Sequence, residues 1–122
     1  MNMERNIMIV EDDEELHTLY GLYLQGENYH ILRAFNGKQA LEILSNAKPD
    51  LIILDMIMPE MDGEAFLEEF HNRSGINKIP IIIASVNDNI PKKYLDMARI
   101  HAVLRKPFSI DTLVTKIKEA IN

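Results

Sequence analysis

The chain has 122 residues, of which 47% are hydrophobic and 26% charged, the balance of an ordinary globular domain rather than of a disordered or membrane-embedded chain. It contains no cysteine, which excludes disulfides, thiolate metal sites and cysteine nucleophiles. The net charge of −6 argues against direct binding to nucleic acid, because contacts with phosphate backbones depend on Lys and Arg.

The first third of the chain predicts two strands and two helices. Residues 7–10 form a short run of mostly branched apolar residues, typical of a strand buried on both faces. The apolar residues that follow have the spacing of one helix face, and the helix is expected to end near Gly26: Leu16, Leu19, Tyr20 and Tyr23. Residues 30–34 predict the second strand. Asn36 and Gln39 resemble a helix cap with its return partner. The inner face of that helix is then Ala40, Leu41 and Leu44.

The remaining residues continue the alternation. Residues 51–54 predict a third strand, and a helix over 62–71 presents Phe66, Leu67 and Phe70 inward. Residues 79–84 predict the fourth strand, and Pro91 suits the first turn of the next helix, whose apolar side is Tyr94, Leu95 and Ala98. Residues 102–104 predict a fifth strand before a last helix capped by Ser109. The apolar stripe of that helix is Ile110, Leu113, Val114, Ile117 and Ile121.

Five alternations of strand and helix predict a doubly wound α/β domain over residues 1–122, with a parallel sheet covered on both faces. The longest apolar runs are too short to cross a membrane and the N-terminus lacks a secretory signal pattern, so we expect no membrane association and a cytoplasmic location. Sheets of this kind bind ligands beyond the carboxyl ends of their strands.

Polar residues that follow the predicted strands form a chemically coherent set: Glu11, Asp12, Asp13, Asp55, Ser85 and Lys106. Carboxylates that converge on one cleft repel each other, and a bound cation relieves this repulsion. Because the available ligand atoms are oxygens and there is no cysteine, a hard cation such as Mg²⁺ is indicated. An aspartate can attack phosphorus and hold the group as an acyl phosphate. A hydroxyl and an ammonium group beside Asp55 would then neutralise the phosphoryl oxygens.

These residues resemble the receiver domains of the response-regulator family in two-component signalling, and the resemblance covers essentially the whole chain. Its motifs are residues 9–12 (IVED), 54–63 (LDMIMPEMDG), 83–85 (IAS) and 106–108 (KPF). The resemblance implies a flavodoxin-like, five-stranded parallel sheet of order 2-1-3-4-5 with five helices. It also implies a phosphorylation switch that catalyses only its own phosphorylation and dephosphorylation, and is otherwise not an enzyme.

The resemblance implies a role for each matching residue. Asp55 accepts the phosphoryl group from a sensor histidine kinase or a histidine phosphotransfer protein. Asp12 binds Mg²⁺ (or Mn²⁺) directly, Glu11 directly or through water, and the metal set is completed by Asp55 and the backbone carbonyl of Ile57. Ser85 and Lys106 bind the phosphoryl oxygens, and the Lys106–Pro107 bond is cis. Asp13 is expected to cap a helix, or to be an acid outside the direct ligands, rather than to bind the metal.

A downstream protein is expected to dock on the fourth helix, the fifth strand and the last helix, although an ordinary solvated face explains the same residues equally well. The candidate contacts are Lys92, Lys93, Tyr94, Val103 and Lys116. Because the sequence stops after the last predicted helix, we expect a stand-alone receiver, although a receiver excised from a longer protein would have the same sequence pattern. The four histidines have no paired metal spacing and are expected to be surface or hydrogen-bonded residues: His17, His30, His71 and His101.

The sequence also departs from the family pattern. Val86 replaces a commonly small residue after Ser85 and would crowd the phosphoryl pocket, and Val103 replaces an aromatic residue that swings as the domain switches. Arg99 and Ile100 stand where Gly-Ala is common, which predicts a remodelled turn.

Two alternatives stay open: an adaptor that is not phosphorylated, and a metal-dependent aspartyl-phosphate phosphatase. Ile57 counts against the phosphatase, because such hydrolases carry a second acid at that position.

Overall fold

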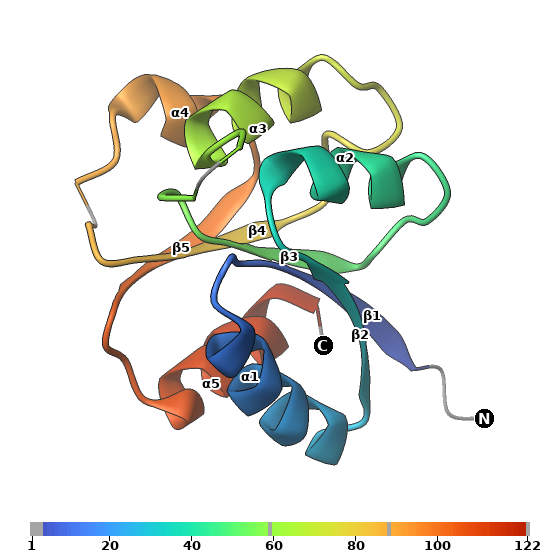
Figure 1. Ribbon diagram of the computed structural model, residues 1–122, viewed down its shortest axis with the longest axis vertical. Helices are drawn as coiled ribbons and strands as arrows, with labels where there is room; N and C mark the ends of the chain where they lie inside the picture. Colours follow the sequence, from blue (N-terminus) through green and yellow to red (C-terminus); the bar gives the residue numbers. More distant parts are fainter. Residues whose placement is uncertain (1–3, 59, 88, 122) are drawn as a thin grey trace.

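The computed structural model describes residues 4–58, 60–87 and 89–121, in which five strands alternate with five helices (Figure 1). The strands are β1 (Arg5–Val10), β2 (Tyr29–Ala34), β3 (Leu51–Leu54), β4 (Ile81–Ser85) and β5 (Ile100–Arg105). The helices are α1 (Glu14–Gly26), α2 (Gly37–Leu44), α3 (Gly63–His71), α4 (Lys92–Met97) and α5 (Ile110–Ile121). Every predicted element is present in the predicted order. Pro59, part of the motif at residues 54–63, lies outside the described residues.

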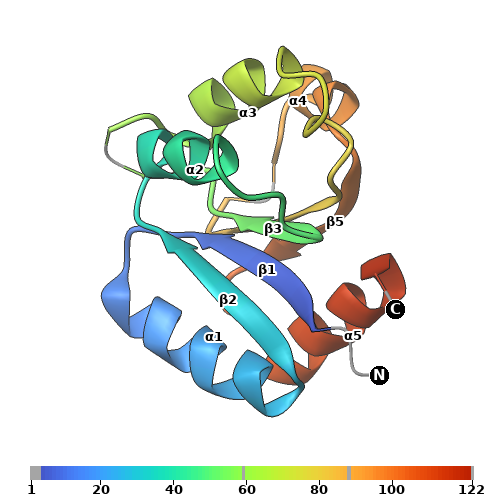
Figure 2. The same cartoon turned by 90° about the vertical axis from the view of Figure 1, so that its right-hand side faces the viewer.

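The strands form one parallel sheet of order β2-β1-β3-β4-β5, which confirms the doubly wound fold. Helices α2, α3 and α4 cover one face, and α1 and α5 lie side by side on the other (Figures 1 and 2). The chain moves outward from β1 to β2 on one side and to β3 on the other, so the connections diverge at the carboxyl end of β1. Within the described ranges, no helix combines the length and apolar character needed to cross a membrane.

Each central strand contributes to two separate hydrophobic cores. Met8 and Val10 of β1 pack under α2, α3 and α4, whereas Ile7 and Ile9 pack against α1 and α5. All four side chains are fully buried. Successive residues of a strand point to opposite faces, so a continuous apolar run is what a sheet covered on both sides requires.

The predicted inner face of α1 is shifted by one residue. His17, Tyr20 and Leu24 are buried, whereas Leu19 and Tyr23 are 45% and 51% exposed. The reason is that His17 is hydrogen-bonded inside the protein: its Nε2 lies 2.7 Å from the carbonyl oxygen of Glu11 and 3.1 Å from that of Ala34. A polar residue whose hydrogen bonds are satisfied can face the core, and an apolar pattern does not reveal it.

The predicted helix caps are present. Asp13 Oδ1 accepts hydrogen bonds from the N–H groups of Glu15 and Leu16 at the start of α1. Asn36 Oδ1 accepts one from Gln39 N–H at 2.8 Å, and Gln39 Oε1 accepts one from Phe35 N–H at 2.9 Å. These caps set where α1 and α2 begin, directly beside the carboxyl ends of β1 and β2.

Some boundaries around β4 and β5 differ from the prediction. Strand β4 begins at Ile81 rather than residue 79, and Ala98 lies beyond the end of α4. The pairing of β4 with β5 is irregular, because Ile81 and Ile82 pair with Ile100 and Ala102. The remodelled turn expected from Arg99 and Ile100 stays a prediction.

Candidate functional site

The strand register gathers the predicted site residues at one edge of the sheet. Val10 pairs with Leu54 and Leu54 with Ile83, so the residues that follow β1 and β3 begin at the same level. Asp55 N–H donates to the carbonyl of Val10 at 3.0 Å, which ties the aspartate to the end of β1. Parallel pairing thus converts positions far apart in the sequence into one cluster.

Three carboxylates form the centre of this cluster. Ligand oxygens of Glu11, Asp12 and Asp55 all lie within 4.8 Å of one another. Glu11 and Asp55 are 3% and 6% exposed, whereas Asp12 faces solvent. Like charges this close favour either a proton or a cation between them. Oxygen ligands around an opening to solvent suit Mg²⁺, which commonly binds through one or two carboxylates and retains water.

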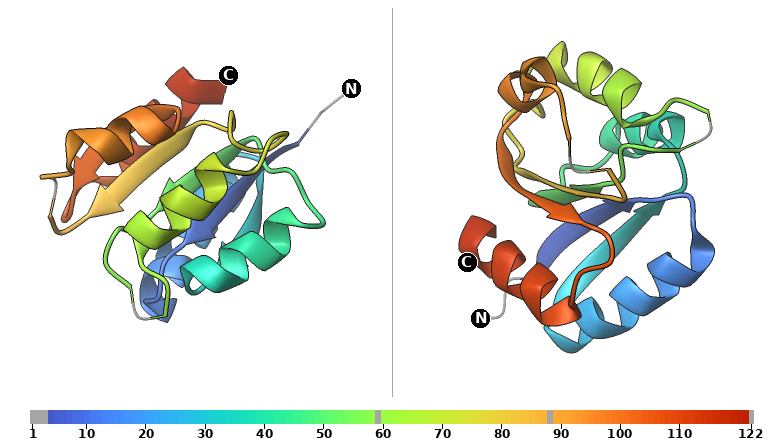
Figure 3. Two further views of the ribbon diagram at one scale, coloured as in Figure 1. Left: turned by 90° about the horizontal axis from the view of Figure 1, so that it is seen from above. Right: turned by 90° about the vertical axis from the view of Figure 1, so that its left-hand side faces the viewer.

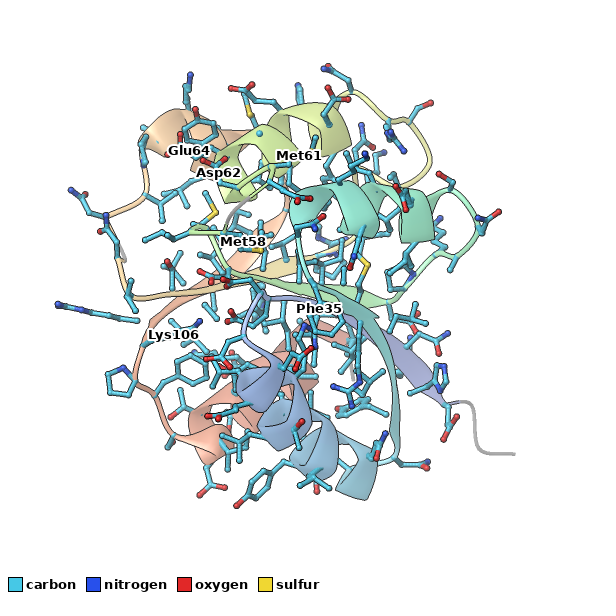
Figure 4. The ribbon with its side chains drawn as sticks, viewed as in Figure 1. Phe35, Met58, Met61, Asp62, Glu64 and Lys106 are labelled. Carbon is cyan, nitrogen blue, oxygen red and sulfur yellow. The ribbon has the colours of Figure 1, made fainter. Side chains whose placement is uncertain are left out.

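Lys106 supplies the positive charge next to these acids. Its ammonium group donates a hydrogen bond to Glu11 Oε1 and lies 3.5 Å from Asp55 Oδ2. Its backbone N–H donates to the carbonyl of Ser85 at 2.8 Å, which anchors the lysine to the end of β4. The Lys106–Pro107 bond is cis, as expected. Figure 4 shows Lys106 at the start of the connection from β5 to α5.

The electrostatic conflict is concentrated on Glu11. Burial, reinforced by the negative charge of Asp55, raises the pKa of Glu11 to about 7, although the hydrogen bond from Lys106 acts in the opposite direction. Near neutral pH this carboxyl group is therefore poised between its protonated and ionised forms. A bound divalent cation would favour the ionised form.

The Asp55 carboxylate is oriented by its own loop. Oδ1 accepts a hydrogen bond from Ile57 N–H at 3.1 Å, while Oδ2 faces Lys106. The Ile57 side chain is largely exposed, so the backbone rather than the side chain of this residue is directed to the site. The role of the Ile57 carbonyl as a metal ligand stays a prediction.

Ser85 lies at the end of β4 with its hydroxyl group fully enclosed. Among the described residues, its Oγ is a buried atom without a hydrogen-bond partner. An unpaired buried hydroxyl costs about 1–3 kcal/mol, and such a cost is understandable where a ligand supplies the missing acceptor. Val86, expected to crowd this region, is 59% exposed and is not packed into the core.

Sequence reasoning missed the support that His17 gives to the site. Carbonyl oxygens only accept hydrogen bonds, so the Nε2 between Glu11 and Ala34 must carry a proton, and the neutral ring leaves Nδ1 as a buried acceptor without a described partner. Burial lowers the pKa of His17. The helical spacing of positions 17, 20 and 24 was the signal that could have revealed its inward direction.

The five residues predicted to contact a downstream protein belong to α4, the edge strand β5 and α5, and Figure 3 shows α4 and α5 on opposite faces of the sheet beside β5. Lys92 forms an exposed ion pair with Asp96, and Lys93 lies 4.8 Å above the ring of the buried Tyr94. Val103 is half-buried against the core under α4, and Lys116 forms an ion pair with Glu119 on α5. Their role in partner binding stays a prediction.

Comparisons with known proteins agree with this geometry. A family model described as the response regulator receiver domain matches residues 7–118. The transcriptional regulatory protein CrdR of Helicobacter pylori is 32% identical over 120 residues, which cover 98% of this chain and 56% of CrdR. The chain spans about half the length of the curated relatives it matches, 50% and 56% in two of them.

Solved structures with a similar fold also include response regulators. The chemotaxis response regulator CheY4 of Vibrio cholerae superposes with a TM-score of 0.86 at 25% identity, covering 98% of this chain and 100% of that one. The response regulator TrrA of Thermotoga maritima, solved in complex with Mg²⁺-BeF, has a TM-score of 0.82 at 28% identity, covering 96% of this chain and 99% of that one. The similarity therefore extends over nearly the whole chain.

Proposed function

The chain belongs to the response regulator receiver domain family of two-component signalling, and we propose that it is a Mg²⁺-dependent switch that accepts a phosphoryl group on Asp55. The observation that carries this proposal is the surroundings of Asp55. Its carboxylate is buried at the carboxyl edge of the sheet, grouped with Glu11 and Asp12 and 3.5 Å from the ammonium group of Lys106. No capping or purely structural role accounts for all of these neighbours.

The proposed donor is the phosphohistidine of a sensor histidine kinase or a histidine phosphotransfer protein. A carboxylate oxygen of Asp55 attacks the phosphorus atom and forms the O–P bond of an acyl phosphate. The P–N bond of the donor breaks, and the histidine nitrogen leaves with the electron pair. The buried setting of Asp55 limits the access of water to the product.

We propose that Glu11, Asp12 and Asp55, with the Ile57 carbonyl, hold Mg²⁺, for which Mn²⁺ would substitute. The grouped oxygens fit such an ion, and the Mg²⁺-BeF complex of TrrA supports the choice of metal. The metal would supply positive charge to the phosphoryl oxygens. Ser85, whose hydroxyl has no partner among the described residues, would donate a hydrogen bond to one of these oxygens, and Lys106 would pair with another.

The effect on a downstream partner follows from the negative charge that the phosphoryl group adds. A phosphoryl group beside Ser85 and Lys106 would draw both residues toward it and bias the connections that lead into α4 and α5. A downstream protein would then bind through Lys92, Lys93, Tyr94, Val103 and Lys116. We propose that residues 1–122 act as one receiver domain without further catalytic activity, able to work on its own. The cytoplasmic location expected from the sequence stays a prediction.

Incubation with acetyl phosphate and Mg²⁺, followed by intact-mass measurement, tests the proposal. The wild-type chain is expected to gain one phosphoryl group as acetate leaves, and Asp55→Asn is expected to gain none. Asp62→Asn is the matched control, because Asp62 caps α3 outside the acidic cluster and asparagine preserves a cap. No addition to the wild type would favour the adaptor, and equal addition to Asp55→Asn would show that Asp55 is not the phosphoacceptor. Multiple turnover of a phosphomonoester would favour the phosphatase.

A further inference from the structure

The loop that leaves Asp55 is held at its far end by the first residue of α2. Gly37 N–H donates a hydrogen bond to the carbonyl of Met61 at 3.1 Å. N–H groups in the first turn of a helix have no partner within the helix, so this donor is free to hold another segment. Figure 4 shows Met61 beside the first turn of α2, and the loop between β3 and α3 lies next to that turn in Figure 1.

The end of this loop has an unfavourable backbone conformation. Glu60 and Met61 have φ angles of 47° and 61°, in the left-handed region that residues other than glycine seldom adopt. Such a conformation persists only where neighbouring contacts impose it. Among the described residues, these contacts include the Gly37 hydrogen bond, a longer one, at 3.5 Å, from Asn36 Nδ2 to Glu60 Oε2, and the packing of Met61 against the core.

Gly37 also has no room for a side chain. A Cβ atom at Gly37 would lie 2.6 Å from the Met61 carbonyl oxygen and 2.8 Å from Met61 Cγ. At the other side of the loop, Gly63 N–H donates to the Met56 carbonyl at 3.1 Å, and a Cβ there would lie 2.9 Å from the Asp55 carbonyl oxygen. Two glycines therefore let α2 and α3 approach the loop closely from both sides.

We infer that Gly37 is a positioning residue for the acidic site: through Met61 it sets the path of the loop that carries Asp55 and Ile57, and thereby the affinity of the site for Mg²⁺. The inference rests on the proposed function. Gly37 touches none of the site's carboxylates, so its effect passes through the backbone. Asp55 is oriented by Ile57 N–H within the same loop, so a displaced Met61 alters the geometry at the oxygens that would bind the metal.

The test compares Gly37→Ala with Gly26→Ala. Gly26, the last residue of α1, is a matched control, because a Cβ atom there meets nothing within 4 Å. Phosphorylation by acetyl phosphate is followed as a function of Mg²⁺ concentration. For Gly37→Ala we expect the half-saturating Mg²⁺ concentration to rise about tenfold while the maximal rate stays within about twofold of wild type. Gly26→Ala is expected to match wild type in both.

The pattern separates positioning from general damage. A variant that merely loses folded protein lowers the maximal rate and leaves the half-saturating concentration unchanged, which would overturn the inference. Met61→Gly is the second variant, because glycine suits a φ of 61° and is expected to fold even where Gly37→Ala does not. It keeps the backbone carbonyl that Gly37 N–H binds but gives position 61 more conformational freedom, so the hydrogen bond fixes the loop less firmly and Mg²⁺ binding is expected to weaken in calorimetry. Wild-type affinity in Met61→Gly would also overturn the inference.

Failure of the proposed function has a different signature. If the wild type takes up no phosphoryl group, the proposed function is wrong, and Mg²⁺ calorimetry on the same variants still tests the positioning by Gly37. If the wild type is phosphorylated and Gly37→Ala behaves like Gly26→Ala, only the positioning inference is wrong.

Discussion

The ammonium nitrogen of Lys106 lies 3.5 Å from Oδ2 of Asp55 and at the same time donates a hydrogen bond to Glu11. In the structure described here, one lysine is thus the counter-charge of two buried carboxylates. A cation beside Glu11 would compete with Lys106 for the Glu11 carboxylate. A phosphoryl group on Asp55 would compete with that carboxylate for Lys106. The stability and the proposed chemistry of the site are consequently linked.

Replacement of this lysine by an uncharged residue tests the link. Lys106→Met leaves Glu11 and Asp55 without their counter-charge, so in chelator we expect the free energy of unfolding to fall by about 3 kcal/mol in urea titrations. Mg²⁺ is expected to recover part of the loss, because it restores positive charge. Lys92→Met, which breaks an exposed pair with Asp96, is expected to cost less than about 0.5 kcal/mol. Equal losses in the two variants would contradict this prediction.

Ser85 is expected to show opposite effects on stability and activity. Ser85→Ala removes a buried hydroxyl without a described partner, so the unphosphorylated protein should be unchanged or more stable by up to about 1 kcal/mol. Phosphorylation should slow at least about tenfold, because a donor to the phosphoryl oxygens is lost. Ser109→Ala removes the hydroxyl that caps α5 and should cost about 1 kcal/mol without slowing phosphorylation. A clear destabilisation by Ser85→Ala would show that its hydroxyl has a structural partner.

Glu11 predicts a pH dependence in metal-free buffer. Its folded pKa is raised to about 7, so its contribution to stability is complete below the unfolded value near 4.5 and is lost as pH rises through 7. Glu11→Gln does not titrate. From pH 5 to pH 8 in chelator, its stability relative to wild type is expected to improve by about 2 kcal/mol. Chemical denaturation at both pH values measures this change. A constant difference between Glu11→Gln and wild type across this pH range would contradict the raised pKa of Glu11.

The lowered pKa of His17 predicts a stability that rises with pH, opposite to the effect of Glu11. Burial lowers its folded pKa below the ordinary value of 6.5, so below that pH the unfolded chain binds a proton that the folded chain does not. Its contribution is therefore present above pH 6.5 and lost as pH falls. His17→Gln keeps a donor at this position but does not titrate. Thermal midpoints between pH 7.5 and 5 should show the advantage of wild type over His17→Gln shrinking as pH falls. An unchanged difference would mean that His17 titrates alike in the folded and unfolded states, which would contradict this prediction.

The sequence alone determined the order of elements and which polar residues follow the strands at the proposed site. Continuous apolar runs identified β1 and β3 as strands buried on both faces, and parallel strands necessarily bring their carboxyl ends to one edge. The acids after those strands, with Ser85 and Lys106, could therefore be grouped from the sequence alone. The caps at Asp13 and Asn36 were equally accessible, because a cap depends on residues only a few positions apart.

Only the tertiary structure decided how these residues meet. The inward direction of His17, the hydrogen bond from Lys106 to Glu11, the unpartnered hydroxyl of Ser85 and the hold of Gly37 on Met61 all join segments distant in sequence. Such contacts depend on helix rotation and loop path, which are set when two cores are packed at once. Hydropathy indicates whether a residue tends to be buried, and it carries no information on which polar group will lie within hydrogen-bond distance of it.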